Sequence, residues 1–396
     1  MSLPVSAIYV HIPFCAKHCA YCDFNTYVEK AQTRIAETVE ATRRDIAQTA
    51  LSYARKAPLA EIETVFFGGG TPTLLSAPQL VSILDTIHDH FPLSPTAEIS
   101  SEANPSSSDA EKFAAMKSAG FNRLSIGVQA MNNEILIALD RFHTVGEAER
   151  AMRSAREAGF TNLNLDLMFG LPKQTLSLWK ETLETALAFS PEHLSLYALT
   201  LEPGTRFERL HTGGKLLLPD EDTELEMYEW CIGRLKERGF EHYEVSNFAQ
   251  LHPTENFRCR HNQVYWHNES YFGFGAGAVS YLDGRRWKRE KLPLRYIEKV
   301  NTGLSTEWGE SNLEVEGETL TSEETLGETL MLGLRLREGV SLTEIGERFG
   351  VNVEDIFREQ IARLTREGFL TLSEDQLTLS HKGLLFANTV LGEFLL

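Results

Sequence analysis

The sequence predicts an α/β fold built on a parallel sheet, followed by a small α+β domain. Between residues 7 and 200, short apolar runs rich in β-branched and aromatic residues alternate six times with longer amphipathic stretches. This alternation is typical of strand–helix units whose strands form one parallel sheet. After an acidic, polar stretch at 316–325, which we expect to be a linker, the pattern changes to short helices and a hairpin. Six units fit either a partial barrel or an open doubly wound sheet.

Each expected strand ends in a loop that leads into an expected helix. The strands are expected at 7–13, 64–70, 98–104, 123–129, 162–170 and 193–200. The helices between them have apolar residues at helical spacing, and two of them end at glycines 120 and 159, as helices commonly do. These helices are expected at 29–54, 76–91, 107–120 and 144–159.

Composition divides the chain into three regions. Residues 1–250 hold the strand–helix units and end in a helix and one short strand, 251–317 are rich in aromatics and glycine, and 318–396 form the last domain. The last domain resembles a winged helix, with helices expected at 340–351 and 353–369 and a hairpin with a closing helix at 370–395. Residues 320–396 hold 13 acidic and 7 basic side chains. We therefore expect an architectural lid rather than a DNA-binding domain.

Charge and hydropathy narrow the cellular setting. The 396 residues carry 56 acidic and 38 basic side chains, a net charge of −18. Such a surface repels nucleic acid and anionic membranes. The N-terminal residues lack the basic segment and apolar run of a signal peptide. The longest uncharged stretch, Thr64 to Leu84, contains three glycines and two prolines and cannot form a spanning helix. We expect a cytoplasmic protein without a membrane anchor.

The strongest chemical signal is a group of three cysteines directly after the first expected strand. Cys15, Cys19 and Cys22 are spaced C-x3-C-x2-C, and thiolates of this kind bind zinc, copper(I) or iron–sulfur clusters. Zinc would need a fourth ligand, which His11 or His18 could supply. A redox pair, Cys19 with Cys22, is a second alternative. Three cysteines on a four-iron cluster leave one iron open, which favours an iron–sulfur site.

This cysteine motif resembles the radical S-adenosylmethionine (SAM) superfamily. Its flanking residues, IYVHIPFC-x3-C-x-YC, resemble the coproporphyrinogen III dehydrogenase-like group over nearly the whole chain. The resemblance implies a partial (β/α)6 barrel with a [4Fe-4S] cluster on Cys15, Cys19 and Cys22. It also implies SAM chelated by the open iron, where one electron cleaves it to a 5′-deoxyadenosyl radical.

The resemblance assigns further residues at strand ends to SAM, although each alone could be a solvated polar group. Arg141 is assigned to the carboxylate of SAM, Glu102 to its ammonium, and Gln129 and Asp166 to its ribose hydroxyls. Tyr9 is expected near the cluster and the sulfonium. The glycine segment FFGGGTPT is assigned to the amino group. The complete set of expected SAM contacts is Tyr9, Phe24, Gly69, Gly70, Thr71, Glu102, Gln129, Arg141 and Asp166.

Two features separate branches of this group. The dehydrogenases resemble C-x3-C-x2-C-x-C and carry an N-terminal extension that reaches their substrate. Here Phe24 stands at the position of the last cysteine, and the cluster motif begins at residue 15, so we expect no such extension. The segment CDFNTY at 22–27 instead resembles the heme-chaperone branch.

A later motif agrees with that branch. HNQVYW at 261–266 fits its H-N-x-x-Y-W signature, in which the histidine, here His261, is the expected heme ligand. Without the resemblance, His261 is more simply a hydrogen-bonded core or loop histidine. Cys259 is a weaker candidate ligand, and Cys231 lies in a helical pattern as buried packing. The glycines in FGFGAGAVSY at 272–281 predict close backbone packing near the barrel mouth.

We therefore expect a heme chaperone that binds a [4Fe-4S] cluster, SAM and, as cargo, heme. The resemblance implies delivery to heme-receiving respiratory proteins at the membrane surface, and a homodimer is compatible with it. The main alternative is an oxygen-independent coproporphyrinogen III dehydrogenase, which releases carbon dioxide from two propionates. Two others are a radical SAM enzyme with a different substrate and a zinc-stabilised regulator that uses the C-terminal domain.

Overall fold

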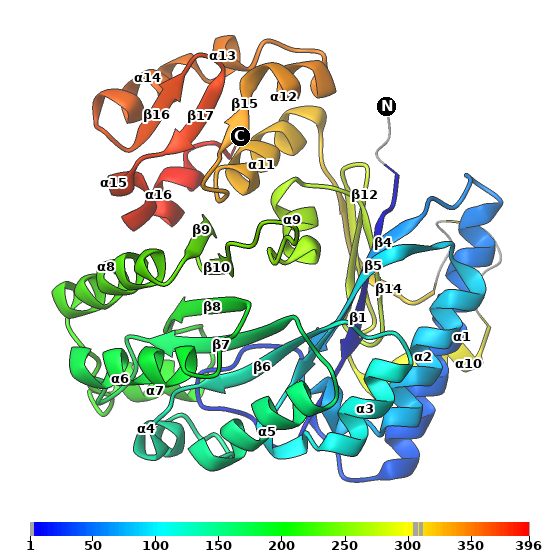
Figure 1. Ribbon diagram of the computed structural model, residues 1–396. Coiled ribbons are helices and arrows are strands. Elements are labelled where there is room, and N and C mark those ends of the chain that lie inside the picture. Colours follow the sequence, from blue (N-terminus) through cyan, green and yellow to red (C-terminus); the bar gives the residue numbers. More distant parts are fainter. Residues whose placement is uncertain (1–3, 304–307, 309–311, 396) are drawn as a thin grey trace.

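A computed structural model describes residues 4–303, 308 and 312–395. Over these residues the centre is a twelve-stranded sheet. Six strands lie side by side in chain order, each parallel to the next, and Figure 1 shows their direction turning steadily across the sheet. The strands are β1 (Ala7–Ile12), β4 (Ile62–Gly69), β5 (Leu93–Ala103), β6 (Arg123–Gln129), β7 (Leu163–Phe169) and β8 (His193–Ala198).

Helices cover one face of this sheet and form the main core with it. Ile8, Val10 and Phe67 are buried against apolar helix residues such as Leu80 and Trp179. The opposite face points into the barrel and carries buried polar side chains such as Thr64 and Asn164, because successive strand residues point to opposite sides. The helices of this region are α1 (Gln32–Ala54), α2 (Ala77–His90), α3 (Ala110–Ser118), α4 (Asn133–Ala138), α5 (Val145–Glu157), α6 (Leu176–Leu187), α7 (Arg206–Thr212) and α8 (Glu221–Glu237).

The glycine-rich region 251–317 continues the same sheet. Its first strand, β11, pairs in parallel with β1, with Ala7 opposite Tyr271, and the next three strands follow as antiparallel neighbours. The sheet therefore extends on both sides of the six-strand unit without closing, which is a partial barrel. The elements are α9 (Arg260–Trp266), β11 (Tyr271–Phe274), β12 (Val279–Leu282), β13 (Arg285–Arg289), α10 (Pro293–Asn301) and β14 (Glu314–Thr319).

Two predictions at the edges of this sheet are wrong. The single strand expected after α8 is a hairpin of β9 (Phe240–Glu244) and β10 (Asn247–Gln250), in which the Glu244 carboxylate accepts bonds from both Ser246 and Asn247. Strand β10 then pairs antiparallel with β8. A two-residue turn between polar residues lacks the glycine that marks most tight hairpins, so the sequence conceals it.

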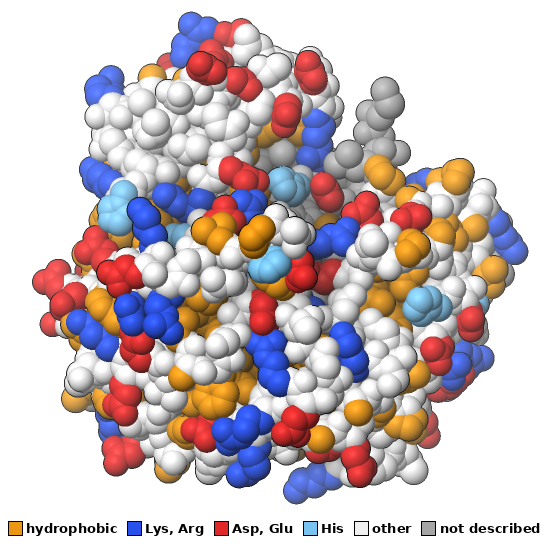
Figure 2. All heavy atoms as spheres, viewed as in Figure 1, with side chains coloured by type: hydrophobic (Ala, Val, Ile, Leu, Met, Phe, Trp, Pro, Cys, Tyr) orange, Lys and Arg blue, Asp and Glu red, His pale blue; other side chains and the backbone are white. Residues whose placement is uncertain are grey.

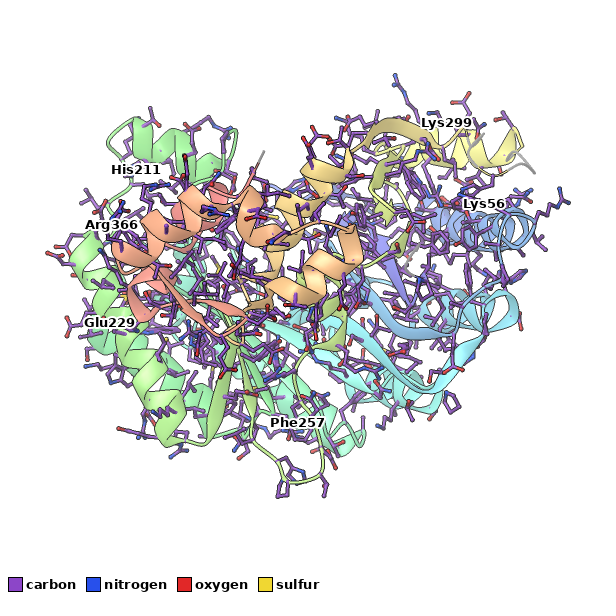
Figure 3. All side chains as sticks on the ribbon, turned by 90° about the horizontal axis from the view of Figure 1, so that it is seen from above. Lys56, His211, Glu229, Phe257, Lys299 and Arg366 are labelled. Carbon is purple, nitrogen blue, oxygen red and sulfur yellow. The ribbon has the colours of Figure 1, made fainter. Side chains whose placement is uncertain are left out.

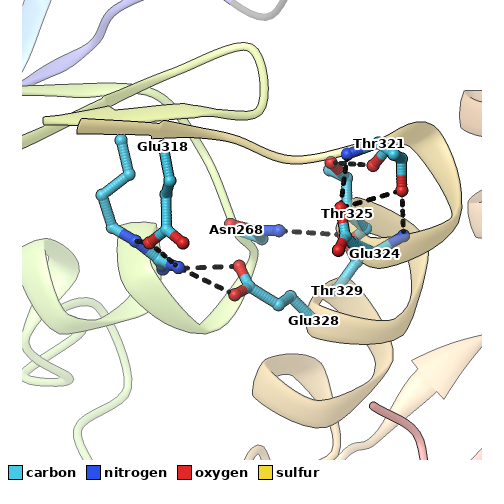
Figure 4. Close-up of polar contacts among 8 residues, drawn as sticks. Asn268, Glu318, Thr321, Glu324, Thr325, Glu328 and Thr329 are labelled. Atoms are coloured by element: carbon cyan, nitrogen blue, oxygen red, sulfur yellow. Dashed lines mark hydrogen bonds and ion pairs between the residues drawn. The ribbon is translucent and has the colours of Figure 1, made fainter. Parts of the chain in front are cut away.

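The acidic stretch 316–325 is likewise ordered structure rather than a linker. It holds the end of β14 and the start of α11, where Thr321 and Glu324 form a reciprocal cap (Figure 4). Arg286 in β13 binds both Glu318 of β14 and Glu328 of α11. The acidic residues are therefore explained by capping and by one arginine shared between two elements.

The C-terminal residues form a small α+β domain with its own apolar core, as expected. Its three strands are ordered β15-β17-β16. The second expected helix is interrupted at Phe357, which separates α13 from α14. The elements are α11 (Ser322–Gly333), β15 (Val340–Ser341), α12 (Leu342–Phe349), α13 (Val353–Ile356), α14 (Arg358–Arg366), β16 (Leu370–Ser373), β17 (Gln376–Leu379), α15 (His381–Leu385) and α16 (Ala387–Gly392).

This domain does not lie over the barrel mouth, so its interpretation as a lid is wrong. It packs on α9, where Arg348 donates to the carbonyls of His267 and Asn268, and α9 in turn contacts the start of β4. Figure 1 shows it on the side from which β1 begins. From that side, Figure 3 shows its helices beside α8, where Glu229 bonds His381. The carboxyl ends of the strands are left uncovered by it.

The distribution of charged side chains and the character of the helices can be compared with what the composition predicts. Acidic and basic side chains are interspersed over both domains in Figure 2, without a field of one sign on that face. Among the described residues, we find no helix that combines the length and the apolar character needed to cross a membrane.

A buried ion pair ties the added strands to the six-strand unit. Asp45 of α1 lies 3.0 Å from Arg289 of β13, both at most 3% exposed, and Tyr296 donates to the same carboxylate. Asp45→Ala leaves a buried guanidinium without a counter-charge, so we expect the free energy of unfolding to fall by about 3–5 kcal/mol in urea denaturation. Glu149→Ala, which removes an exposed pair with Arg153, is the control and should cost less than about 0.5 kcal/mol. Equal losses would contradict this assignment.

Candidate functional site

A cavity of about 360 Å³ opens where the six parallel strands end at their carboxyl termini. Side chains from the loops after different strands converge there, as in other barrels of parallel strands. Two expected site residues, Tyr9 and His261, do not line it. The expected residues that do are Cys15, Cys19, Cys22, Phe24, Gly69, Gly70, Thr71, Glu102, Gln129, Arg141 and Asp166.

The cysteine loop forms one wall of the cavity. It runs between β2 (Phe14–Cys15) and β3 (Tyr27–Val28), which pair in parallel. Thr71 donates to the Cys15 sulfur at 3.5 Å, and an Arg141 Nη lies 3.7 Å from the Cys19 sulfur. Burial raises the pKa of Cys15 and raises that of Cys22 to about 11. These thiols are free, and without a positively charged metal group Cys22 stays protonated at neutral pH.

The donor set fits a [4Fe-4S] cluster better than zinc. Among the described residues, no three or more His, Cys, Asp and Glu side chains are placed to hold one metal ion. His11 already bonds Tyr9 at 3.0 Å and the Asn25 carbonyl at 2.9 Å, and His18 bonds Thr26 at 3.1 Å. A cluster binds each cysteine through a different iron, so its ligands are more widely spaced than those of one ion.

Asn25 holds the cysteine loop against the glycine-rich segment after β11. Its side-chain amide donates to the carbonyls of Ala276 and Lys291, at 3.1 and 3.2 Å. At Gly277, whose φ is +88°, a Cβ atom would lie 2.1 Å from that amide nitrogen, so only glycine fits. The close backbone packing predicted for this segment is confirmed. The distant segments 22–27 and 272–281 thus meet beside the cavity.

The opposite wall carries two half-buried carboxyl groups. Glu102 accepts a bond from the Gly69 amide at 3.1 Å, and Asp166 accepts one from Ser125 at 2.9 Å. Burial, and next the charge of Asp166, raises the pKa of Glu102 to about 8. Burial likewise raises the pKa of Asp166. Two carboxyl groups held this close favour a ligand that brings a positive charge and hydroxyl groups.

Arg141 supplies a positive charge to the cavity, whereas Lys17, which also lines it, is paired with Asp140. One Nη donates to the Gly127 carbonyl at 2.7 Å, while its Nε is buried without a hydrogen-bond partner. An unpaired buried donor is costly, and a ligand carboxylate would satisfy it. Gln129 ends β6 with a φ of +64°, a conformation that non-glycine residues rarely adopt. With Glu102 and Asp166, these groups match a ligand that carries an ammonium, a carboxylate and hydroxyls, as SAM does.

The structure adds cavity residues that the sequence did not indicate. Ser125 and Met168 lie on the inward face of β6 and β7, Tyr197 lies in β8, and Thr200 follows that strand. A period of two places Ser125 on the same face as Gln129, and Met168 on the same face as Asp166. That period was the available signal for the first two.

Tyr9 and His261 lie together inside the barrel, outside the cavity. The His261 ring is 1% exposed and stacks on Phe66, with ring centroids 5.2 Å apart, and the Tyr9 ring is 6.4 Å away. Its nitrogens bond Thr64 at 2.8 Å and Tyr265 at 3.0 Å. Burial lowers the pKa of His261 to about 3, and so, to a lesser degree, does the nearby Arg123 charge. The histidine is neutral, interior and fully hydrogen-bonded here.

The remaining cysteines are also interior. Cys231 is completely buried in α8, which confirms its expected packing role, and its thiol donates to the Tyr228 carbonyl. Cys259 is completely buried beside Glu98, with sulfur and carboxylate oxygen 3.7 Å apart. Burial raises its pKa to about 12, so the thiol is protonated.

Comparisons with known proteins agree with this architecture. Residues 9–186 match the Radical SAM superfamily, and residues 320–386 match the HemN C-terminal domain. The chain is 38% identical over 392 residues to Heme chaperone HemW of Bacillus subtilis, with 99% of each chain covered. It is 35% identical over 400 residues to the protein of that name from Escherichia coli, covering 100% of this chain and 99% of the relative.

Among solved structures, coproporphyrinogen III oxidase (HemN) from Escherichia coli, a radical SAM enzyme, superposes with a TM-score of 0.83. The identity is 25%, covering 99% of this chain and 90% of that one. A partial barrel whose first strand leads into three cysteines, beside a cavity lined by carboxyl groups and an arginine, defines a radical SAM protein. The sequence identity to the HemW proteins over the whole length of the chain is more specific than this superfamily assignment. Within that superfamily, the chain belongs to the HemW family.

The raised pKa of Glu102 makes ligand binding depend on pH. At pH 7 a carboxyl group with a pKa of about 8 is protonated, and the positive charge of a bound ligand favours the ionised form. On SAM binding at pH 7, Glu102 should therefore release close to one proton, and this contribution should make the affinity rise between pH 6 and about 8. Calorimetry in two buffers of different ionisation enthalpy measures the total release. Glu102→Gln should lower that release by close to one proton, and equal release by the wild type and Glu102→Gln would refute the assignment.

Proposed function

We propose that the chain is a heme chaperone that binds a [4Fe-4S] cluster and SAM at the barrel mouth and takes up heme for transfer. The main support for this proposal is the sequence similarity to Heme chaperone HemW proteins over the entire chain, from the cysteine loop through the C-terminal domain. Phe24 supports it, since the dehydrogenases are expected to have a cysteine there, whereas this phenylalanine is 63% exposed at the cavity.

The residues around the cavity suit this role. A bound cluster would supply an electron and an open iron site for the amino and carboxylate groups of SAM. Cys15, Cys19 and Cys22 would hold it, and Thr71 stabilises the Cys15 thiolate by its hydrogen bond. Arg141 is positioned for the SAM carboxylate and Glu102 for its amino group. Gln129 and Asp166 would meet the ribose hydroxyls, and Phe24 would shield the mouth.

His261 is the proposed heme ligand, and its surroundings set a condition. A neutral imidazole offers a lone pair to iron, and its lowered pKa keeps it neutral. Its Nε2, however, is bonded to Tyr265 inside the barrel. Heme iron can reach it only if Tyr265 gives way, and both residues lie on α9. Heme uptake through His261 therefore requires α9 to shift from its place between the barrel and the C-terminal domain.

The free thiols also bear on the cellular compartment of the protein. Five free thiols, three of them beside the cavity, favour a reducing compartment, and we propose the cytoplasm. Heme would then pass to heme-receiving respiratory proteins at the membrane surface, and the carrier acts as a monomer or a homodimer. The acidic surface, with its net charge of −18, disfavours nucleic acid as a partner.

The cluster assignment is tested by metal content. Anaerobic reconstitution should give close to four irons per chain, because three thiolates without a fourth ligand suit a site-differentiated cluster. Alanine at Cys15, Cys19 or Cys22 should abolish iron uptake. Cys231→Ala is the matched control and should retain it, since that thiol is buried in α8. One zinc per chain with no iron would overturn the assignment.

The function itself is tested by offering heme and coproporphyrinogen III separately. The structural likeness to HemN makes the dehydrogenase the specific alternative. We expect the purified protein to retain heme, observed as a Soret band after gel filtration. With SAM, a strong reductant and coproporphyrinogen III, we expect no protoporphyrinogen.

The matched histidine variants locate the heme. His261→Ala should weaken heme binding or shift the Soret band, whereas His252→Ala, at an exposed loop histidine, should not. Conversion of coproporphyrinogen III by wild-type protein that retains no heme would make this chain a dehydrogenase.

A further inference from the structure

A chain of buried hydrogen bonds crosses the barrel from the cavity to the start of α9. The Asn164 amide nitrogen donates to Asp166 at 2.8 Å, and the Asn164 oxygen meets His193 Nδ1 at 2.6 Å. His193 Nε2 lies 2.8 Å from the Tyr243 hydroxyl, which accepts the Cys259 backbone amide at 3.2 Å. Asn164, His193 and Tyr243 are each at most 2% exposed. None of them lines the cavity.

The chemistry of the side chains determines which group is the donor and which the acceptor in each of these hydrogen bonds. An ionised Asp166 only accepts, so Asn164 presents its nitrogen to Asp166 and its oxygen to His193. His193 must then donate through Nδ1. Burial lowers the pKa of His193 far below its usual range, so the ring is neutral and its Nε2 accepts from Tyr243. Every donor thus points toward Asp166, and aligned bonds of this kind strengthen one another.

Asn164 also determines how Asp166 is held. Its nitrogen lies 2.7 Å from Ser125, which itself donates to the second Asp166 oxygen at 2.9 Å. Asn164 and Ser125 therefore each donate a hydrogen bond to a different oxygen of the Asp166 carboxylate, which restricts its rotation. A carboxylate fixed in this way is ready to accept bonds from ligand hydroxyls without further ordering.

The series of hydrogen bonds ends at Cys259, at the start of a helix that contacts both domains. Cys259 is the N-cap residue of α9, the helix that carries His261. Glu98 holds the same helix start independently, through the amides of Arg260 and His261 at 3.3 Å. Just beyond α9, Asn268 donates to Thr329 of the C-terminal domain at 3.0 Å. A change transmitted to Cys259 thus reaches both His261 and the contact between the two domains.

We propose that Asn164 and His193 are positioning residues that hold Asp166 for SAM, and that Tyr243 couples SAM occupancy to the placement of α9. This inference rests on the proposed function, because the contact of Asp166 with the ribose of SAM is part of it. Occupancy of the cavity tightens the chain and holds the start of α9. Without a ligand on Asp166, the bonds from Tyr243 to His193 and from Cys259 to Tyr243 are weaker, which eases the release of His261 from Tyr265.

Tyr243→Phe separates coupling from positioning. It removes one oxygen and breaks the chain beyond His193, leaving the grip of Asn164 and Ser125 on Asp166. In cluster-loaded protein, SAM should slow hydrogen exchange of the amides at 259–266 in the wild type. In Tyr243→Phe the SAM-dependent slowing should be lost, while SAM affinity changes less than about threefold. Slowing of equal size in both proteins would overturn the coupling.

His193→Phe tests the positioning. It removes the shorter of the two bonds to the Asn164 oxygen, the other coming from Ser195 at 3.2 Å, so SAM affinity should fall about tenfold, the loss of one buried hydrogen bond. His193→Gln keeps a donor and an acceptor in reach and should restore much of it, which general destabilisation would not allow. His242→Phe is the matched control, because His242 stacks on Phe248 outside the chain, with centroids 4.2 Å apart. Unchanged affinity in His193→Phe would refute the positioning role.

The two levels of failure are distinguishable. Wild-type protein that binds SAM without slowing exchange in α9 overturns the coupling and leaves the proposed function standing. Wild-type protein that takes up its cluster but binds no SAM overturns both.

Discussion

Everything at the barrel mouth depends on the attachment of the cysteine loop to the seam between β1 and β11. Asn25 makes this attachment, because its side chain bonds two carbonyls beyond β11 while its own carbonyl accepts from His11 at the end of β1. Without this attachment, the long loop that carries Cys19 and Cys22 would be held by few backbone hydrogen bonds. With it, the three thiols are presented to the same cavity as the strand ends.

The second constraint is electrostatic. Glu102 and Asp166 lie on one side of the cavity and Arg141 on the other, and among the described residues these three groups form no ion pair with one another, whereas Lys17 and Asp140, which also line the cavity, pair at 3.2 Å. Burial makes this arrangement costly in the free protein, as the raised pKa of Glu102 records. A zwitterionic ligand with hydroxyl groups relieves both ends at once. The cavity is thus selective for charge pattern as well as for shape.

The sequence was sufficient for features that depend on local pattern. The six parallel strands follow from period-two runs and the cysteine triad from motif spacing, whereas the cavity residues at strand ends follow from the resemblance to the radical SAM superfamily. It failed where partners are distant in sequence. That β10 returns to pair with β8, and that Arg286 collects two acidic residues, depends on register. The burial of His261 depends on Thr64, far away in sequence, and no motif reveals such a contact.

The central claim is that the cavity holds a cluster whose open iron binds SAM beside Glu102 and Arg141. Electron–nuclear double resonance on the reduced, reconstituted protein, with SAM labelled with 15N in its amino group, tests it most directly. The account predicts a 15N coupling to the cluster that disappears when unlabelled SAM is added in excess. A reduced cluster whose spectrum does not respond to SAM, and which shows no 15N coupling, would contradict the account.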